Sequence, residues 1–169
     1  MKVIVNDANI LIDLVDLNIL PHFFNLEFEF YTTNLILNEL FESQQERLRP
    51  YIDKGSLTLD ELSDMDLSEI NMIQKANPML SDKDCSAYYQ AKKYNAILIT
   101  SDHALRKFCV KNGLEVHGHL WVFDRMVEGE TIPGGIASEK LTELCEIVNP
   151  KLGLPKAECL KRIRSWEKL

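Results

Sequence analysis

The chain has 169 residues, of which 46% are hydrophobic and 27% are charged, proportions that are typical of a globular protein and sufficient for one buried core. No apolar run approaches the roughly 18 residues of a transmembrane helix. The N-terminal segment also lacks the small-residue cleavage site of a signal peptide, so we expect a cytoplasmic protein with no membrane partner. The net charge of −7 argues against a protein that coats nucleic acid constitutively.

Short apolar runs alternate with segments of helical periodicity along the chain. The expected strands are 2–6, 28–32, 57–59, 96–100 and 114–117. The expected helices are 8–17, 19–24, 34–53, 63–76, 81–94, 101–112, 119–128, 135–148 and 155–167. This alternation predicts an α/β fold of three layers, in which helices cover both faces of a central parallel sheet of five strands.

Two acidic residues follow predicted strands. Asp7 comes directly after KVIVN (2–6), and Asp102 comes after AILIT (96–100) and Ser101. In open parallel sheets, ligands bind outside the carboxyl ends of the strands, where the strand order reverses. We therefore expect the two carboxylates to converge if these strands are neighbours, an adjacency that order along the chain does not establish.

Two further acids interrupt apolar helix faces. Glu39 lies one helical turn after Leu35 and Ile36, and Asp84 leads the apolar residues at positions 87, 88 and 91. A buried charge needs a partner or a metal, and neither stripe contains a lysine or an arginine. Clustered carboxylates repel one another, and a hard divalent cation such as Mg²⁺ or Mn²⁺ relieves this repulsion.

Each of these acids also has an ordinary structural explanation, and the residues alone leave it open. Asp7 and Asp102 suit the N-cap of the helix that follows each of them. Asp84 suits the first turn of a helix that Ser81 caps, where the helix dipole favours an acid. Glu39 suits a partly exposed helix position. The case for a shared site depends on the four acids together.

Four segments occur in a characteristic order: VNDANILIDL (5–14), TTNLILNEL (32–40), LSDKDCSAYYQAKKYNAILITSDHALRK (80–107) and GLEVHGHLWVFDRMVEG (113–129). Together they resemble the PIN domain, a family of metal-dependent ribonucleases. The resemblance covers residues 1–128, which we interpret as the core of a single PIN-like domain of residues 1–169. Residues 129–169 then form a helical extension, with turns at Pro133-Gly134-Gly135 and Gly153-Leu154-Pro155.

The resemblance implies four catalytic carboxylates that also bind the metal: Asp7, Glu39, Asp84 and Asp102. We call these four residues the acidic quartet. Asp82 is a rival for the third position. The resemblance further implies that Asn9 hydrogen-bonds within the site, and that Thr100 or Ser101 is the hydroxyl residue that supports the last acid.

The activity that the resemblance implies is hydrolysis of RNA phosphodiesters with one or two Mg²⁺ or Mn²⁺ ions, leaving 5′-phosphate and 3′-hydroxyl ends. Asp102 or Glu39 would also orient the attacking water. Small PIN proteins of this length are often VapC-like toxins of bacterial toxin–antitoxin pairs, which implies a protein antitoxin and a homodimer. The helices after residue 134 depart from the short toxin pattern.

Two rival functions are weighed against this one. A phosphatase of the haloacid-dehalogenase type also has an aspartate after its first strand, but it needs a second aspartate two residues later, where this chain has Asn9. A PIN scaffold used only for binding would be favoured by loss of one acid, and the acidic quartet is complete.

Predictions for the histidines, the basic C-terminal segment and the cysteines are weaker. His117 and His119 form a candidate metal pair, but no third soft ligand is near them in the sequence. Residues 150–169 carry six basic and two acidic residues, so this segment has a net charge of +4 and the first 149 residues have −11. The basic face of the last helix suits either a solvated surface or a grip on phosphate. The four cysteines are expected to be reduced, packed thiols.

Overall fold

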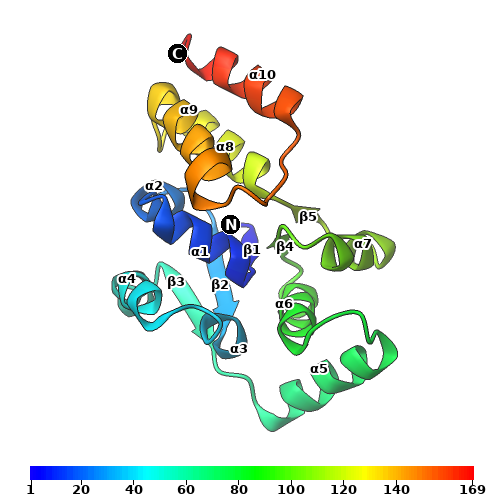
Figure 1. Ribbon diagram of the computed structural model, residues 1–169. Helices are drawn as coiled ribbons and strands as arrows, with labels where there is room; N and C mark the ends of the chain where they lie inside the picture. The colour runs from blue at the N-terminus through cyan, green and yellow to red at the C-terminus, as the bar shows by residue number, and fades with distance from the viewer.

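The computed structural model describes residues 1–169, and a five-stranded sheet lies at its centre (Figure 1). The strands are β1 (Val3–Asn6), β2 (Glu29–Thr33), β3 (Leu57–Asp60), β4 (Ile97–Ile99) and β5 (Val116–His117). Their order is β3-β2-β1-β4-β5, and every adjacent pair is parallel. The predicted α/β fold with five parallel strands is confirmed.

Helices cover both faces of the sheet. They are α1 (Ala8–Asp16), α2 (Leu20–Phe24), α3 (Asn34–Leu37), α4 (Glu42–Asp53), α5 (Asp64–Ala76), α6 (Asp82–Lys93), α7 (His103–Lys111), α8 (His119–Glu128), α9 (Gly134–Glu143) and α10 (Lys156–Trp166). On one side α6 packs across β1, β2 and β4, with α5 and α7 beside it. On the other side α1 packs against α2 and α4, as Figure 1 shows.

The central strands are buried on both faces, which explains why they read as continuous apolar runs rather than as alternating ones. Ile4 and Val5 in β1 and Leu98 and Ile99 in β4 have no exposed surface. The ladder pairs Ile4 with Ile97 and Val5 with Leu98. The register therefore places the ends of β1 and β4 next to each other.

The position of β1 determines where a site can form. From β1 the chain proceeds to β2 on one side, and β4 lies on the other side. The strand order therefore reverses at β1, and a crevice opens there outside the carboxyl ends of the strands. The adjacency of β1 and β4, which the sequence left open, is confirmed.

The predicted helix 34–53 is wrong as a single element. The structure has two helices, α3 and α4, separated by residues 38–41. The chain breaks because Phe41 is extended, with ψ 152°, and its backbone N–H donates to the side chain of Gln44 (3.0 Å), which starts a new helix. Glu39 consequently lies on an exposed turn after α3 and not on a buried helix face.

The C-terminal helices form a layer outside α1 and α2. The predicted helix 135–148 is regular only as far as Glu143 and ends in a π-helical turn, η1 (Leu144–Val148). Asn149 follows this turn and donates from Nδ2 to Oδ2 of Asp13 in α1 (3.1 Å). Trp166 in α10 is buried and stacks on Phe123 in α8, with 6.1 Å between ring centroids. No helix combines the length and apolar character that a membrane span requires.

We expect Gly134→Ala to destabilise the protein by about 1–2 kcal/mol, because overpacking a closed contact forces the backbone to move. A Cβ atom at Gly134 would overlap the backbone carbonyl oxygen of Trp166, whereas a Cβ atom at Gly135 meets nothing within 4 Å. The matched control is therefore Gly135→Ala, one position further along α9. Urea unfolding of both variants checks this, and equal stabilities would contradict the packing of α10 on α9.

Candidate active site

Asp7 and Asp102 lie at adjacent strand ends, and each caps the helix that follows it. The backbone N–H of Asp7 donates to the carbonyl oxygen of Ile99 at the end of β4 (3.0 Å). Oδ1 of Asp7 accepts from the N–H of Ala8 (2.8 Å), and Oδ1 of Asp102 accepts from the N–H of Leu105 (2.7 Å). Both residues therefore have the capping role that the sequence suggested, and each cap fixes a carboxylate at the strand end.

Thr100 joins these two acids. Its hydroxyl donates to Oδ2 of Asp7 (2.6 Å) and accepts from the backbone N–H of Asp102 (3.1 Å). Thr100 has no exposed surface. The side chain of Ser101 is half-buried and takes no part in this bridge. Of the two hydroxyl residues that the sequence offered, Thr100 is therefore the one that contacts the acids.

Asp84 approaches the strand ends from α6, which packs across the sheet. Ser81 caps this helix: its side chain accepts from the N–H of Asp84 (3.0 Å), and Oδ2 of Asp84 accepts from the N–H of Ser81 (2.8 Å). The predicted Ser81 cap is confirmed, and the reciprocal pair of bonds forms a capping box. The side chain of Asp84 is half-buried, whereas Asp82 is exposed and accepts from the N–H of Lys83 (2.9 Å).

Glu39 has an ionic partner, which the sequence analysis did not anticipate. Nζ of Lys83, the second residue of α6, lies 2.9 Å from Oε1 of Glu39. The pair joins two elements that pack together, α3 with the turn after it and α6. Neither apolar stripe contains a lysine or an arginine, as the sequence showed, but a lysine from another helix pairs with Glu39.

Burial dominates the electrostatics of Asp7 and Asp84, and neighbouring acids add to it. Burial raises the pKa of Asp7 to about 6, and the negative charges of Asp84 and Glu39 add to this rise. Burial also raises the pKa of Asp84, with contributions from Asp102 and Glu39. The bonds from Thr100 and Ala8 act in the opposite direction on Asp7. The pKa values of Asp7 and Asp84 are therefore raised chiefly by burial and further by the negative charges near them.

The donor set fits a hard divalent cation in its chemistry. Three of the four carboxylates have no lysine or arginine within 4.0 Å, so their mutual repulsion is not neutralised. No three His, Cys, Asp or Glu side chains stand close enough together to enclose a metal ion in this structure. Glu39 is paired with Lys83 through Oε1. In this arrangement the four side chains therefore do not themselves enclose a metal site.

We expect Thr100→Val to cost about 1 kcal/mol of stability, because it removes a hydrogen-bond donor from a buried carboxylate at nearly constant volume. Ser101→Ala is the neighbouring control and should leave the stability nearly unchanged. Urea unfolding measures both variants, and a wild-type stability for Thr100→Val would contradict the role of the bridge.

Asn9 lies exposed on the first turn of α1. Its hydrogen bond within the site stays a prediction. The buried asparagine nearby is Asn6 at the end of β1, whose Nδ2 atom donates to the carbonyl oxygen of Tyr31 (3.4 Å) and whose Oδ1 atom has no partner.

The two histidines that the sequence offered as a metal pair contact different partners. Nε2 of His117 lies 3.0 Å from Oε1 of Glu115, and the His117 ring stacks on Trp121. Nε2 of His119 lies 2.7 Å from Oδ2 of Asp13, and both side chains are buried. This buried pair joins α8 to α1. The two imidazoles therefore do not share a site.

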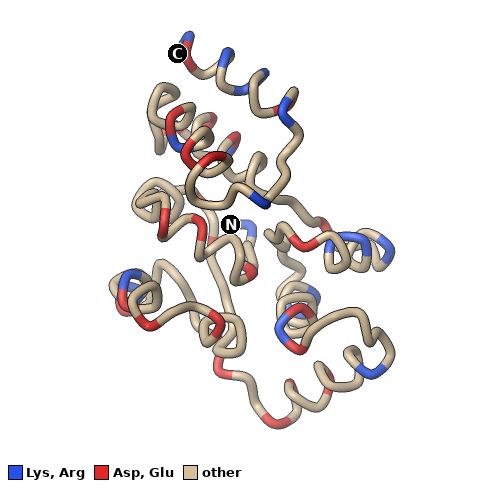
Figure 2. Tube along the Cα trace, in the orientation of Figure 1, with Lys and Arg blue, Asp and Glu red and all other residues tan.

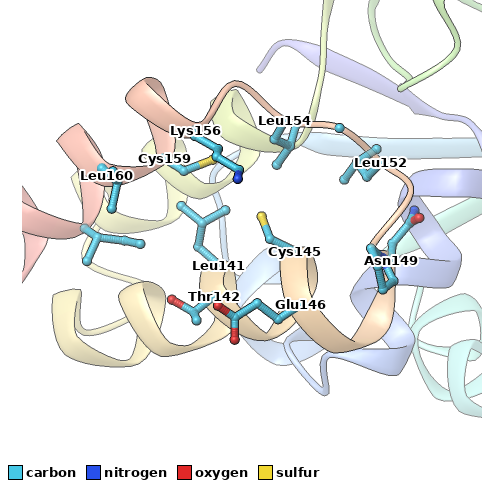
Figure 3. Close-up of a pocket in the computed structure, with 13 residues that line it drawn as sticks. Leu141, Thr142, Cys145, Glu146, Asn149, Leu152, Leu154, Lys156, Cys159 and Leu160 are labelled. Atoms are coloured by element: carbon cyan, nitrogen blue, oxygen red, sulfur yellow. The ribbon is translucent and has the colours of Figure 1, made fainter.

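A cavity of about 650 Å³ lies between η1 and α10, in the C-terminal extension. Its lining is mainly apolar, and Cys145 and Cys159 face it from the two elements, as Figure 3 shows. No member of the acidic quartet lines this cavity. All four cysteines are free thiols. The cavity is therefore separate from the candidate active site.

Basic residues gather on two helices, α7 and α10, as Figure 2 shows. In α7 they are Arg106, Lys107 and Lys111, which follow Asp102 within the same helix that this residue caps. In α10 Lys161 and Arg164 are exposed, and Lys168 is exposed in the turn after this helix. Of these two helices, only α7 begins next to a member of the acidic quartet, Asp102.

A family model, DUF3368, described as a PIN domain, matches residues 3–159. The match includes every strand, all four acids, α9 and the first residues of α10. No curated protein sequence matches the chain. Because the model covers nearly the whole chain, the protein belongs to the PIN-domain family, whose members are generally nucleases.

Proposed function

We propose that the protein is a metal-dependent endoribonuclease that hydrolyses phosphodiester bonds in RNA. The observation that carries this proposal is the convergence of Asp7 and Asp102 at the adjacent ends of β1 and β4, where the Thr100 hydroxyl joins them. In a PIN domain this is the edge of the sheet where a ligand should bind. The match to the PIN family also argues against the haloacid-dehalogenase alternative.

Asp7, Glu39, Asp84 and Asp102 would hold one or two Mg²⁺ or Mn²⁺ ions. Such an ion lowers the pKa of a bound water and neutralises charge on the phosphate. Asp7 would be the central ligand, because it is the most deeply buried of the four and its orientation is fixed by Thr100 and Ala8. We take Asp84 rather than Asp82 as the third acid, because Asp84 interacts electrostatically with Asp7.

The protein would also orient the attacking water and attract the RNA. Asp102 or Glu39 would accept a hydrogen bond from the attacking water and so align it with the phosphorus atom. The basic residues of α7 would attract the RNA backbone towards an otherwise acidic pocket. Thr100 and Asn9 would support the carboxylates by hydrogen bonding. The products would carry 5′-phosphate and 3′-hydroxyl ends.

We further propose that the chain is a single PIN-like domain and the VapC-like toxin of a bacterial toxin–antitoxin pair. It would act in the cytoplasm as a homodimer, and a protein antitoxin would block the acidic quartet. Support for this role is the small size of the chain together with its PIN family membership. A genome in which no small antitoxin-like gene adjoins this one would count against the toxin role without affecting the nuclease.

The test is incubation of total cellular RNA with the purified protein and Mn²⁺, with a chelator control, followed by ligation-based mapping of the ends. We expect discrete fragments with 5′-phosphate ends that disappear in the chelator. Intact RNA from a folded protein that binds Mn²⁺ would favour the scaffold alternative. Fragments that persist in the chelator would contradict metal dependence.

A further inference from the structure

Two of the four thiols share the cavity of the C-terminal extension. Cys145 lines it from η1 and Cys159 lines it from α10. Figure 3 shows both sulfur atoms pointing into the space between the two elements. The two side chains interact directly, and this interaction acts on the Cys145 thiol. The other two cysteines, Cys85 and Cys109, have no exposed surface and do not line the cavity.

The elements that carry the two thiols are each anchored to the helices beneath them. The first thiol belongs to η1, which ends at Asn149, and Nδ2 of this residue donates to Oδ2 of Asp13 in α1 (3.1 Å). The second belongs to α10, where Nε of Arg162 donates to Oδ1 of Asp124 in α8 (2.9 Å). The two thiols are therefore held near each other, which favours a reaction between them over a reaction with another molecule.

The two thiols differ in their access to solvent. Cys145 is half-buried, whereas Cys159 is only 8% exposed. The cavity beside them has a volume of about 650 Å³, which is in the range of pockets that admit small molecules. Burial raises the pKa of the Cys145 thiol to about 11, and Cys159 and Glu146 add to this rise. Little thiolate forms at neutral pH, so any reaction of Cys145 is slow.

We propose that Cys145 and Cys159 form a reversible redox site that a low-molecular-weight disulfide, such as glutathione disulfide, oxidises. Cys145 loses its proton and attacks one sulfur of the reagent, so that a mixed disulfide forms and one glutathione thiolate leaves. Cys159 then loses its proton and attacks the Cys145 sulfur, and the second glutathione thiolate leaves. The protein gives up two protons and two electrons, and the reagent becomes two thiols. This inference does not depend on the proposed nuclease function.

The resulting disulfide would close the loop of residues 145–159 and join η1 to α10. A cross-link over a loop of this length stabilises a protein mainly by restricting the unfolded chain. We therefore expect the oxidised protein to melt about 5–10 °C above the reduced protein, and dithiothreitol to reverse this change. Oxidation would thus fasten the last helix of the chain to the rest of the domain.

The test is incubation of the folded protein with glutathione disulfide at mildly alkaline pH, followed by mass spectrometry of the intact chain and of its peptides. We expect the wild type to lose the mass of two hydrogen atoms and to yield a cross-linked peptide containing Cys145 and Cys159. Cys159→Ser should stop at one glutathione adduct on Cys145, because no second thiol displaces it. Cys145→Ser should gain no adduct in the same time, and Cys85→Ser should behave like the wild type.

The wild-type measurement decides the question even if a serine variant proves unstable. A lasting glutathione adduct on the wild type would overturn the redox site. An unmodified wild type, when the urea-unfolded chain reacts with the same reagent, would overturn it too. Reaction of Cys85 or Cys109 in the folded protein as fast as that of Cys145 would also contradict it, since that result reflects unfolding. Equal melting temperatures of the oxidised and reduced forms would overturn the anchoring of α10.

Discussion

Asp7→Asn should reduce RNA cleavage by about 10³-fold. A divalent ion supplies several kcal/mol of transition-state stabilisation, and each 1.36 kcal/mol corresponds to a tenfold change in rate. Asn keeps the size of the side chain and can still accept the bond from Ala8, which the Asp7 side chain accepts at 2.8 Å. It lacks the negative charge that a metal ligand needs. The loss should therefore be one of catalysis and not of folding.

The same substitution should make the metal-free protein more stable at pH 7, by about 2 kcal/mol. Burial disfavours the charged form of Asp7, and Asn carries no charge to desolvate. Asp82→Asn is the matched control, because it removes one charge from an exposed position at the start of α6. Cleavage rates and urea unfolding in a chelator measure the two effects. Destabilisation of Asp7→Asn, or a rate within tenfold of the wild type, would contradict the assigned role.

The stability of the metal-free protein should depend on pH through Asp7. Its pKa is raised from 3.8 to about 6 in the folded protein. The folded state then binds the proton more tightly than the unfolded state, so this contribution is complete below about pH 4 and is lost as the pH rises through 6. The shift corresponds to about 3 kcal/mol, at 1.36 kcal/mol for each pKa unit.

The Asp7→Asn variant isolates this effect from the other titrating groups. The free energy of unfolding of the wild type minus that of the variant should fall by about 2.5 kcal/mol between pH 4 and pH 7, most of the full shift. Chemical unfolding in a chelator, repeated at each pH, gives this difference. Curves that stay parallel across the range would show that the Asp7 carboxylate is not desolvated in the fold.

Sequence patterns within a single helix predicted the hydrogen bonds that form at the start of that helix. Asp7, Asp102 and the pair Ser81–Asp84 follow capping patterns, and the structure has each of these hydrogen bonds. The alternation of strands and helices predicted the parallel sheet. The pairing of β1 with β4 was not predictable in this way, because strands that are distant in sequence become neighbours only through the crossover.

The environment of Glu39 shows where periodicity fails. The apolar spacing continues through Leu35, Ile36 and Leu40, yet the chain turns at residues 38–41 because Gln44 caps a new helix. A capping side chain bonds to a backbone group three residues away, and this bond leaves no trace in the spacing of apolar residues. The ion pair with Lys83 depends on how two helices pack, so no pattern within one segment could have indicated it.

The central claim is that the acidic quartet binds a divalent cation, and direct Mn²⁺ titration of the purified protein tests it best. We predict that the wild type binds Mn²⁺ and that Asp7→Asn, Asp84→Asn and Asp102→Asn each weaken this binding at least tenfold, whereas Asp82→Asn does not. No binding by the wild type, or equal binding by all four variants, would show that the acids serve only as helix caps and ion-pair partners.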